Sequence, residues 1–470
     1  MRNRFHLTGF DGLVLLVISG LVLAILGTIL LGDRVGVQID RYSPTEETGS
    51  TAFISLTFSE AMNWDSVIAH VLFAPELNGE YKWSGKTLRF TPSKPLQPGI
   101  EYIVKLRAGA ESTGRRKVLQ DTDFSFRVRS PRIAYLTPAD AVPANIWMAD
   151  PTLPEDATQI TFSPTGIVNF AASPDGSIVA FAEHTQAGTS DIKLLDLQSG
   201  AINQLTNCED SNCDTPVWRP DGTMVAYHRI DLNTGISGLG VSPTRVWVVD
   251  LTATPYTNRP LFTDNQILGF SPQWSADGRR IAIYDSNSHS VYIRDFTDDS
   301  TKVVPLGNTG SDAALSPDGN QISFARLMID DQTNEFQFDL HLADVETDEV
   351  RDVFGPEEPV DDRESAWNPD GRHLVIARRY TDDRTTRARQ VFLLDTDTGT
   401  TEELVFDERY FNGFFSWDPQ GNQLAIYRFP ELTATGESNS IGRPEVWTYA
   451  LSAGELTQIA ENAYMPQWIP

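Results

Sequence analysis

A turn motif of the form Ser-Pro-Asp-Gly recurs along this chain and constrains its fold more than any other feature. Proline presets φ at the second turn position, Asp or Asn tolerates the third, and glycine takes the left-handed position that returns the chain as a hairpin. Each copy therefore predicts a tight turn between two antiparallel strands. The copies are Ala172-Ser173-Pro174-Asp175-Gly176, Arg219-Pro220-Asp221-Gly222, Ser275-Ala276-Asp277-Gly278, Ser316-Pro317-Asp318-Gly319, Asn368-Pro369-Asp370-Gly371 and Asp418-Pro419-Gln420-Gly421.

The residues around the turn repeat with it. A tryptophan usually stands three positions before the turn Asp, as in Trp218, Trp274, Trp367 and Trp417, with Ala172 and Leu315 in the other copies. An apolar strand follows the turn, then a third strand that usually ends in Asp, then a shorter fourth strand. Four antiparallel strands in a unit of roughly 50 residues are typical of a β-propeller blade.

These units resemble the WD-repeat-like repeat of the TolB family. That repeat reads Trp-Ser-Pro-Asp-Gly, then an Ile-Ala-Phe-like strand such as Val179-Ala180-Phe181, then an Ile-Tyr-Val-x-Asp-like strand such as Val291 to Asp295. The resemblance covers about residues 131 to 470. It implies a TolB-like β-propeller over that part of the chain.

Two incomplete repeats predict how the ring closes. Ile133-Ala134-Tyr135, Ile146 to Asp150 and Thr158 to Thr161 match a second, third and fourth strand with no first strand before them. Met465-Pro466-Gln467-Trp468 matches a first strand with no turn after it. Joining them gives one composite blade, which removes the open sheet edges. The sequence thus predicts seven blades, one more than in TolB itself.

The amino terminus predicts a membrane anchor. Leu13 to Leu31 is an uncharged run of 19 residues, which at ~1.5 Å per residue spans nearly the whole ~30 Å hydrocarbon core. We assign residues 1–12 to a cytoplasmic tail and 13–32 to a single transmembrane helix with the amino terminus inside. A cleaved signal peptide is the alternative, but Thr28 to Gly36 offers no small-x-small cleavage site.

Residues 33–46 are polar and without periodicity, which favours a linker. Alternating strands separated by Pro and Gly turns then predict a small β-sandwich over residues 47–130. This segment resembles a bacterial Ig-like domain of the S-layer-associated (SbsA) type. The match rests on Phe58-Ser59-Glu60-Ala61-Met62, on Leu96-x-Pro98-Gly99-x-x-Tyr102 and on Phe124-x-Phe126. Such domains are usually spacers or adhesive modules.

Catalytic motifs are missing from the sequence. Propellers of this type precede the catalytic domain in peptidases resembling dipeptidyl peptidases, but no Gly-x-Ser-x-Gly nucleophile motif occurs here. A metal-dependent lyase is the other enzymatic alternative, and it would need several of the ring histidines to cluster around a metal. We predict no enzyme activity, no metal and no cofactor. The ring histidines are His184, His228, His289, His341 and His373.

Cys208 and Cys213 are the only cysteines and are separated by four residues. An anchored extracytoplasmic domain permits oxidation, so we predict a disulfide between them. Metal ligation with Glu209, Asp210 or Asp214 is the alternative.

One position predicts a binding face. Eight residues after the turn position, four of the blades carry an arginine, and the same blades have the longest following loops. Guanidinium groups suit bidentate contacts to carboxylates, and long loops on a rigid scaffold usually carry binding. We therefore expect an acidic or carboxylate-terminated protein or peptide partner here. The alternative is that each arginine pairs with a neighbouring acid to hold its loop. The four residues are Arg229, Arg326, Arg378 and Arg428.

The chain is strongly acidic, with a net charge of −27, which argues against a nucleic-acid partner. We therefore predict a bacterial single-pass membrane protein that displays both domains outside the cytoplasm and binds or scaffolds a protein. A structural cell-envelope role is the first alternative, and a propeller enzyme, lyase or hydrolase-like, is the second.

Overall fold

The computed structural model describes residues 9–31, 36–233, 240–307, 313–329, 336–355, 358–433 and 435–470. The chain divides into two compact units, of which the second holds residues 127–470. Helix α1, Gly9–Leu31, contains the predicted anchor segment. By length and apolar character together, no helix in the described residues qualifies as a membrane crossing. The membrane anchor therefore stays a prediction.

Eight strands and one short helix follow α1 in two four-stranded sheets. The order is β1-β3-β6-β5 in the first sheet and β2-β8-β7-β4 in the second. Phe58, Phe90, Phe126 and Val104 are buried between alternating polar positions, which is the pattern expected of a sandwich. Strand β1 lies inside the segment predicted to be a linker, so folded structure begins earlier than expected. The elements are β1 (Ile39–Ser43), β2 (Glu47–Thr48), β3 (Ile54–Phe58), α2 (Trp64–Ile68), β4 (Val71–Ala74), β5 (Gly79–Ser84), β6 (Thr87–Pro92), β7 (Glu101–Leu106) and β8 (Thr122–Val128).

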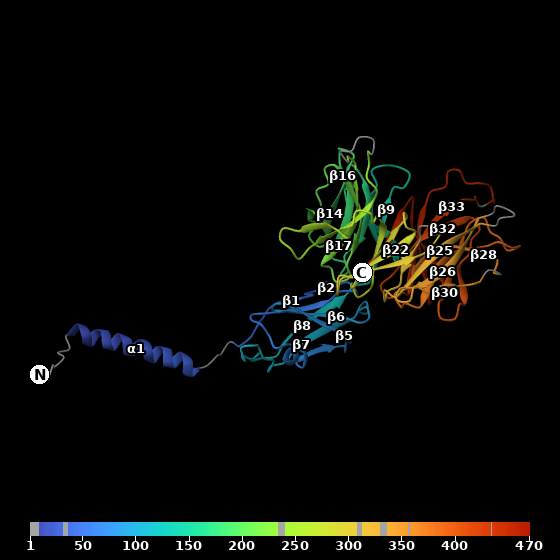
Figure 1. The fold of residues 1–470 in the computed structure, drawn as a ribbon. Helices are drawn as coiled ribbons and strands as arrows, with labels where there is room; N and C mark the ends of the chain where they lie inside the picture. Colours follow the sequence, from blue (N-terminus) through green and yellow to red (C-terminus); the bar gives the residue numbers. More distant parts are fainter. Residues whose placement is uncertain are drawn as a thin grey trace. The chain divides into compact units, whose positions relative to one another are not determined.

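From residue 132 onward all regular elements among the described residues are strands (Figure 1). They form seven sets of four strands with antiparallel neighbours, and a parallel pair of Ser190 with Asn212 joins sets 2 and 3 into one eight-stranded sheet. The composite set is β36 (Tyr464–Ile469), β9 (Arg132–Thr137), β10 (Asn145–Asp150) and β11 (Leu153–Gln159). Set 2 is β12 (Ile167–Ala172), β13 (Ile178–His184), β14 (Ser190–Asp196) and β15 (Ile202–Gln204). Set 3 is β16 (Ser211–Trp218), β17 (Met224–Asp231), β18 (Arg245–Asp250) and β19 (Thr257–Pro260).

The remaining four sets follow in the same strand order. Set 4 is β20 (Phe270–Trp274), β21 (Arg280–Asp285), β22 (Ser290–Asp295) and β23 (Thr301–Pro305). Set 5 is β24 (Ala314–Leu315), β25 (Gln321–Ile329), β26 (Phe336–Asp344) and β27 (Val350–Asp352). Set 6 is β28 (Val360–Trp367), β29 (His373–Tyr380), β30 (Gln390–Asp395) and β31 (Thr401–Val405). Set 7 is β32 (Tyr410–Trp417), β33 (Gln423–Pro430), β34 (Glu445–Ala450) and β35 (Glu455–Glu461).

The recurring motif forms the tight turns that the sequence predicts. The glycine has a positive φ in each copy, for example 63° at Gly176 and 74° at Gly371. The turn Asp accepts a main-chain hydrogen bond from the residue two positions later, as Asp221 Oδ1 does from Thr223 N at 3.0 Å. Both features depend on the motif alone, so the turn repeats wherever the motif does.

Apolar clusters join each set to the next. Ala226 and Val248 of set 3 pack with Ile281 and Ile283 of set 4, for example. A corresponding cluster joins set 7 to the composite set and contains Trp468. Four of the repeated tryptophans add a polar link, because the indole donates to a carbonyl of the preceding set, whereas the buried indole nitrogen of Trp274 has no such partner among the described residues. The bonds are Trp218 to Ala171 (3.1 Å), Trp367 to Ala314 (3.1 Å), Trp417 to Ala366 (3.1 Å) and Trp468 to Ser416 (3.0 Å).

The C-terminal strand completes the composite set as predicted. β36 pairs with β9 in antiparallel register, with Tyr464 opposite Leu136 and Trp468 opposite Ile133. Met465, the second residue of β36, has a φ of 53° where the register shifts. The strand bends there without losing its pairing on either side.

Candidate binding face

The strand order defines one edge of the sets, which we call the loop face. Neighbouring strands in each set are antiparallel. In each set, the second strand therefore ends at the edge where the third strand begins. The fourth strand also ends at this edge. The Ser-Pro-Asp-Gly turns lie at the opposite edge. The four predicted arginines stand near the ends of second strands β17, β25, β29 and β33, so they belong to the loop face.

Exposed apolar side chains gather on this face, which the sequence reasoning missed. Among the described residues of the seven sets, the large apolar side chains that are exposed away from the loop face are Leu153, Ile202, Tyr256 and Val303. Those at or near the loop face are Val142, Phe162, Val241, Met328, Ile329, Phe336, Phe406, Phe414 and Ile441. Concentrations of exposed apolar surface mark interaction sites in soluble domains.

The hairpin of β25 and β26 provides the best-defined part of this surface. Its strands have nine residues each, whereas β21 and β22 in set 4 have six. Leu327 stands opposite Phe338 and Ile329 opposite Phe336, so these four side chains share one face of the hairpin. Ile329 is 51% exposed and Phe336 63% exposed. The alternation Leu-x-Ile and Phe-x-Phe in the sequence could have revealed this apolar face.

Two arginines stand over Phe338 at the base of the same hairpin. The Cζ atoms of Arg363 and Arg389 lie 5.2 and 5.9 Å from the Phe338 ring centroid. Asp361 is fully buried and accepts hydrogen bonds from Phe338 N (3.0 Å) and from Arg389 Nη2 (2.8 and 2.6 Å). This carboxylate fixes the hairpin base against set 6. The apolar face is thus held in place and bordered by positive charge.

Two of the four predicted binding arginines are buried, which corrects the sequence prediction for them. Arg378 makes a bidentate pair with Asp362, with both N–O distances at 2.7 Å. The Arg378 side chain is 4% exposed and that of Asp362 is 0% exposed. Burial raises the pKa of Asp362, and the hydrogen bonds from Arg378 oppose that rise. Arg378 therefore matches the alternative expectation, that the arginine holds its loop through a neighbouring acid.

Arg428 is buried as well, at 2% exposure. Its Nε donates to Asn412 Oδ1 at 3.0 Å, and its Cζ lies 4.0 Å from the Tyr410 ring and 5.0 Å from the Trp447 ring. Burial lowers the pKa of this guanidinium, and Asp407 is the nearest opposing charge, 3.9 Å away. Arg428 supports the packing of set 7 and is not accessible to a partner.

Arg229 and Arg326 are partly exposed. Arg229 donates to Asp231 at 2.8 Å and stacks over Trp247 at 4.7 Å. Partial burial raises the pKa of Asp231, but the hydrogen bonds from Arg229 and Ser211 outweigh this effect and hold the pKa below its ordinary value. Arg326 lies 3.3 Å from His341 Nε2 and donates to the carbonyl of Leu306 at 3.3 Å. Among the described residues, no carboxylate pairs with Arg326.

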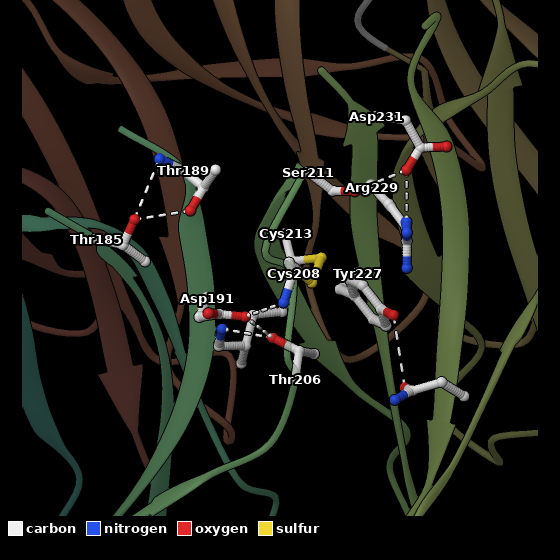
Figure 2. The surroundings of a disulfide bond; sticks show 12 residues. Thr185, Thr189, Asp191, Thr206, Cys208, Ser211, Cys213, Tyr227, Arg229 and Asp231 are labelled. Carbon is white, nitrogen blue, oxygen red and sulfur yellow. Dashed lines mark hydrogen bonds and ion pairs between the residues drawn. A yellow bond between two sulfur atoms is a disulfide. The ribbon is translucent and has the colours of Figure 1, made fainter. Parts of the chain in front are cut away.

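Cys208 and Cys213 form a disulfide with Cα atoms 6.2 Å apart. Figure 2 shows it between Asp191 and Thr206 on one side and Tyr227 and Arg229 on the other. Asp191 accepts from Cys208 N (2.8 Å) and from Thr206 Oγ1 (2.9 Å), which closes the loop entering β16. Both cysteines are buried, and Cys213 stands directly opposite Arg229 in the sheet. The disulfide therefore stiffens the strand end that presents Arg229.

Comparison with known proteins defines both parts of the chain. The model of the bacterial Ig-like domain family matches residues 33–128. This segment is a bacterial Ig-like domain. The match begins before β1, which explains why β1 belongs to the Ig-like domain and not to a linker. No curated protein is found as a relative of the whole chain.

Solved structures show the fold of the other part. A puromycin-hydrolysing peptidase from Mycobacterium tuberculosis is 12% identical, with 91% of this chain and 57% of that chain covered and a TM-score of 0.52. A prolyl endopeptidase is 13% identical, with 71% and 49% covered and a TM-score of 0.52. TolB from Acinetobacter baumannii is 14% identical, with 85% and 83% covered and a TM-score of 0.42. This chain spans about half the length of the two peptidases. At such identities the likeness shows the fold alone, a β-propeller following the Ig-like domain.

The propeller histidines lie in different sets, and His228, His289, His341 and His373 have separate local partners. His228 accepts a hydrogen bond from Ser271 N at 3.0 Å, with Asp214 3.5 Å away on its other nitrogen. Its Nε2 lone pair is thus occupied and cannot serve as a base towards Ser271. His373 pairs with Asp370 in a turn at 2.6 Å, and His341 meets Arg326. Among the described residues, no three His, Cys, Asp or Glu side chains gather as metal ligands.

Reducing the disulfide is expected to lower the free energy of unfolding by about 2 kcal/mol or less, because it closes only a short loop. Chemical denaturation of the oxidised and reduced protein measures this loss, and intact mass shows the two hydrogens gained on reduction. Replacing both cysteines with alanine should give a similar or larger loss, since the side chains are buried. Finding two free thiols in protein isolated from its native source would contradict the assignment.

Proposed function

We propose that this chain is a membrane-anchored, extracytoplasmic binding or scaffold protein without catalytic activity, whose propeller captures a protein segment on the loop face. The single observation that carries the proposal is the hairpin of β25 and β26. Its apolar face, Leu327, Ile329, Phe336 and Phe338, is exposed towards its tip, although a two-stranded hairpin has few means of stabilising such a surface alone. A bound segment would cover it.

The architecture behind this proposal is a closed ring of seven blades, one for each set of four strands. The apolar clusters between successive sets support it, including the cluster that joins set 7 to the composite set. So does the pairing of β36 with β9. A ring closed in this way offers a rigid platform, which favours binding by its loops over movement of the blades.

The charges around the hairpin indicate the chemistry of the partner. Arg363 and Arg389 border the apolar face at Phe338, whereas Arg326, next to Leu327 in β25, points to the opposite face of the hairpin. Apolar side chains flanked by carboxylates would complement this surface. Of the four arginines first proposed, Arg229 and Arg326 are partly exposed but lie outside this apolar face, and Arg378 and Arg428 have structural roles.

The double substitution Ile329→Lys and Phe336→Lys is expected to reduce capture of the partner at least tenfold. Each exposed side chain of this size contributes about 1.5–3 kcal/mol when it is fully buried, and lysine would resist that burial. Full-length protein reconstituted in detergent would be used to capture partners from envelope extract, with the bound proteins quantified by mass spectrometry.

The matched control is Ile202→Lys with Val303→Lys, since these residues are also exposed and apolar but lie on outer strands. The control should capture the same protein as the unmodified chain. Equal capture by the hairpin variant and the control variant would refute the proposed binding surface.

A further inference from the structure

A cleft of about 500 Å³ opens on the loop face of the composite set, away from the hairpin. Its walls come from the connection between β9 and β10, from the starts of β12 and β36 and from the end of β13. Ligand pockets in proteins usually measure about 300–1,000 Å³. The lining residues used below are Asp140, Ala141, Val142, Val168, His184 and Tyr464.

The charged group beside the cleft is already neutralised. Asp140 pairs with Arg443 at 2.9 Å and accepts from Asn462 Nδ2 at 2.6 Å. Asn462 in turn accepts from the main-chain nitrogen atoms of Ala139 and Asp140 through its side chain, at 3.1 and 3.2 Å. An ionic ligand would lose hydration here without gaining an opposite charge. The cleft therefore disfavours charged ligands.

The remaining surface is apolar apart from the side chains of Thr165, His184 and Tyr464. Ala141, Val142 and Val168 line the cleft, and Val142 is 88% exposed at its rim. Nearby Phe162, in the connection that leads into β12, is also exposed. The Tyr464 hydroxyl and the His184 imidazole are side-chain groups in the lining that can exchange hydrogen bonds with a ligand. Burial raises the pKa of Tyr464, so the phenol stays protonated and keeps its donor.

We propose that this cleft binds an uncharged, apolar peptide segment of about two residues. The aliphatic walls would bury its side chains, and Tyr464 with His184 would serve the donor and acceptor of a peptide amide. This site lies in a different blade from the hairpin of set 5. It goes beyond the proposed function, because it can bind a peptide whether or not the hairpin captures a protein.

The test uses three blocked dipeptides, acetyl-Leu-Leu-amide, acetyl-Leu-Asp-amide and acetyl-Leu-Lys-amide, added to the full chain. Line broadening of the peptide NMR signals measures binding. We expect the neutral peptide to bind at least tenfold more tightly than either charged one. Ala141→Trp should fill the cleft from an exposed position and reduce binding at least tenfold. Tyr464→Phe should reduce it several-fold while keeping the packing.

Ala453→Trp is the matched control, because Ala453 is also exposed but lies in the turn before β35, at the opposite edge. It should bind the neutral peptide as the unmodified protein does. Thermal unfolding of all variants confirms that they are folded. Absence of binding by the neutral peptide, equal binding of all three peptides, or an unchanged affinity in Ala141→Trp would overturn the proposal.

Discussion

Deleting residues 465–470 is expected to destabilise the whole propeller by at least about 5 kcal/mol, since removing one buried tryptophan alone costs about 3–5 kcal/mol. The deletion also removes the strand that covers β9, exposing a sheet edge in the composite set. It breaks the indole bond from Trp468 to Ser416, and with it the cluster formed with Ala425 and Val446. Urea denaturation followed by tryptophan fluorescence would measure the loss.

A milder variant distinguishes the effect of ring closure on stability from the effect of local packing around Trp468. Trp468→Phe keeps most of the apolar contact and loses one indole hydrogen bond, so it should cost only about 1–2 kcal/mol. If the truncated protein unfolds at the same urea concentration as the intact chain, the ring does not depend on this strand. The closed-ring architecture would then be wrong.

The turns and strand positions could be predicted because their causes are local. Asp221 and Gly222 need only their immediate neighbours to form the turn, and Trp218 marks the inner strand before it. The edge strands of the Ig-like domain lacked such a signal. β1 and β2 are short and polar, and their pairing with β3 and β8 depends on residues far along the chain. Because residues 33–46 are polar, the sequence favours a linker where the structure has β1.

The burial of the arginines was harder to predict, although a signal existed. Residues eight positions before and after the turn position face each other, as Asp362 faces Arg378 and Asn412 faces Arg428. Set 3 places Cys213 opposite Arg229 in the same way, so that arginine has no cross-strand acceptor and remains partly exposed. The residue that stands opposite the arginine therefore decides whether the arginine side chain is buried against it or remains partly exposed.

This pairing makes Asp362→Asn the substitution with the largest expected effect on stability at the loop face. It keeps the size of the side chain but leaves the buried guanidinium of Arg378 without its opposite charge. Breaking a buried ion pair by removing one partner costs about 3–5 kcal/mol. Arg378→Ala should destabilise the propeller for the same reason, because that change would leave the buried Asp362 carboxylate without its partner. Chemical denaturation measures both variants.

Asp382→Asn provides the control, because Asp382 pairs with Arg384 in the connection that follows β29, and both side chains are accessible to solvent. An exposed pair contributes about 0–1 kcal/mol, so this variant should remain close to the unmodified protein. Combining Asp362→Leu with Arg378→Met should recover most of the loss, since apolar residues can replace a buried pair at little cost. A loss below about 1 kcal/mol in Asp362→Asn would show that Arg378 does not rely on this carboxylate. Arg378 would then become a candidate for binding again.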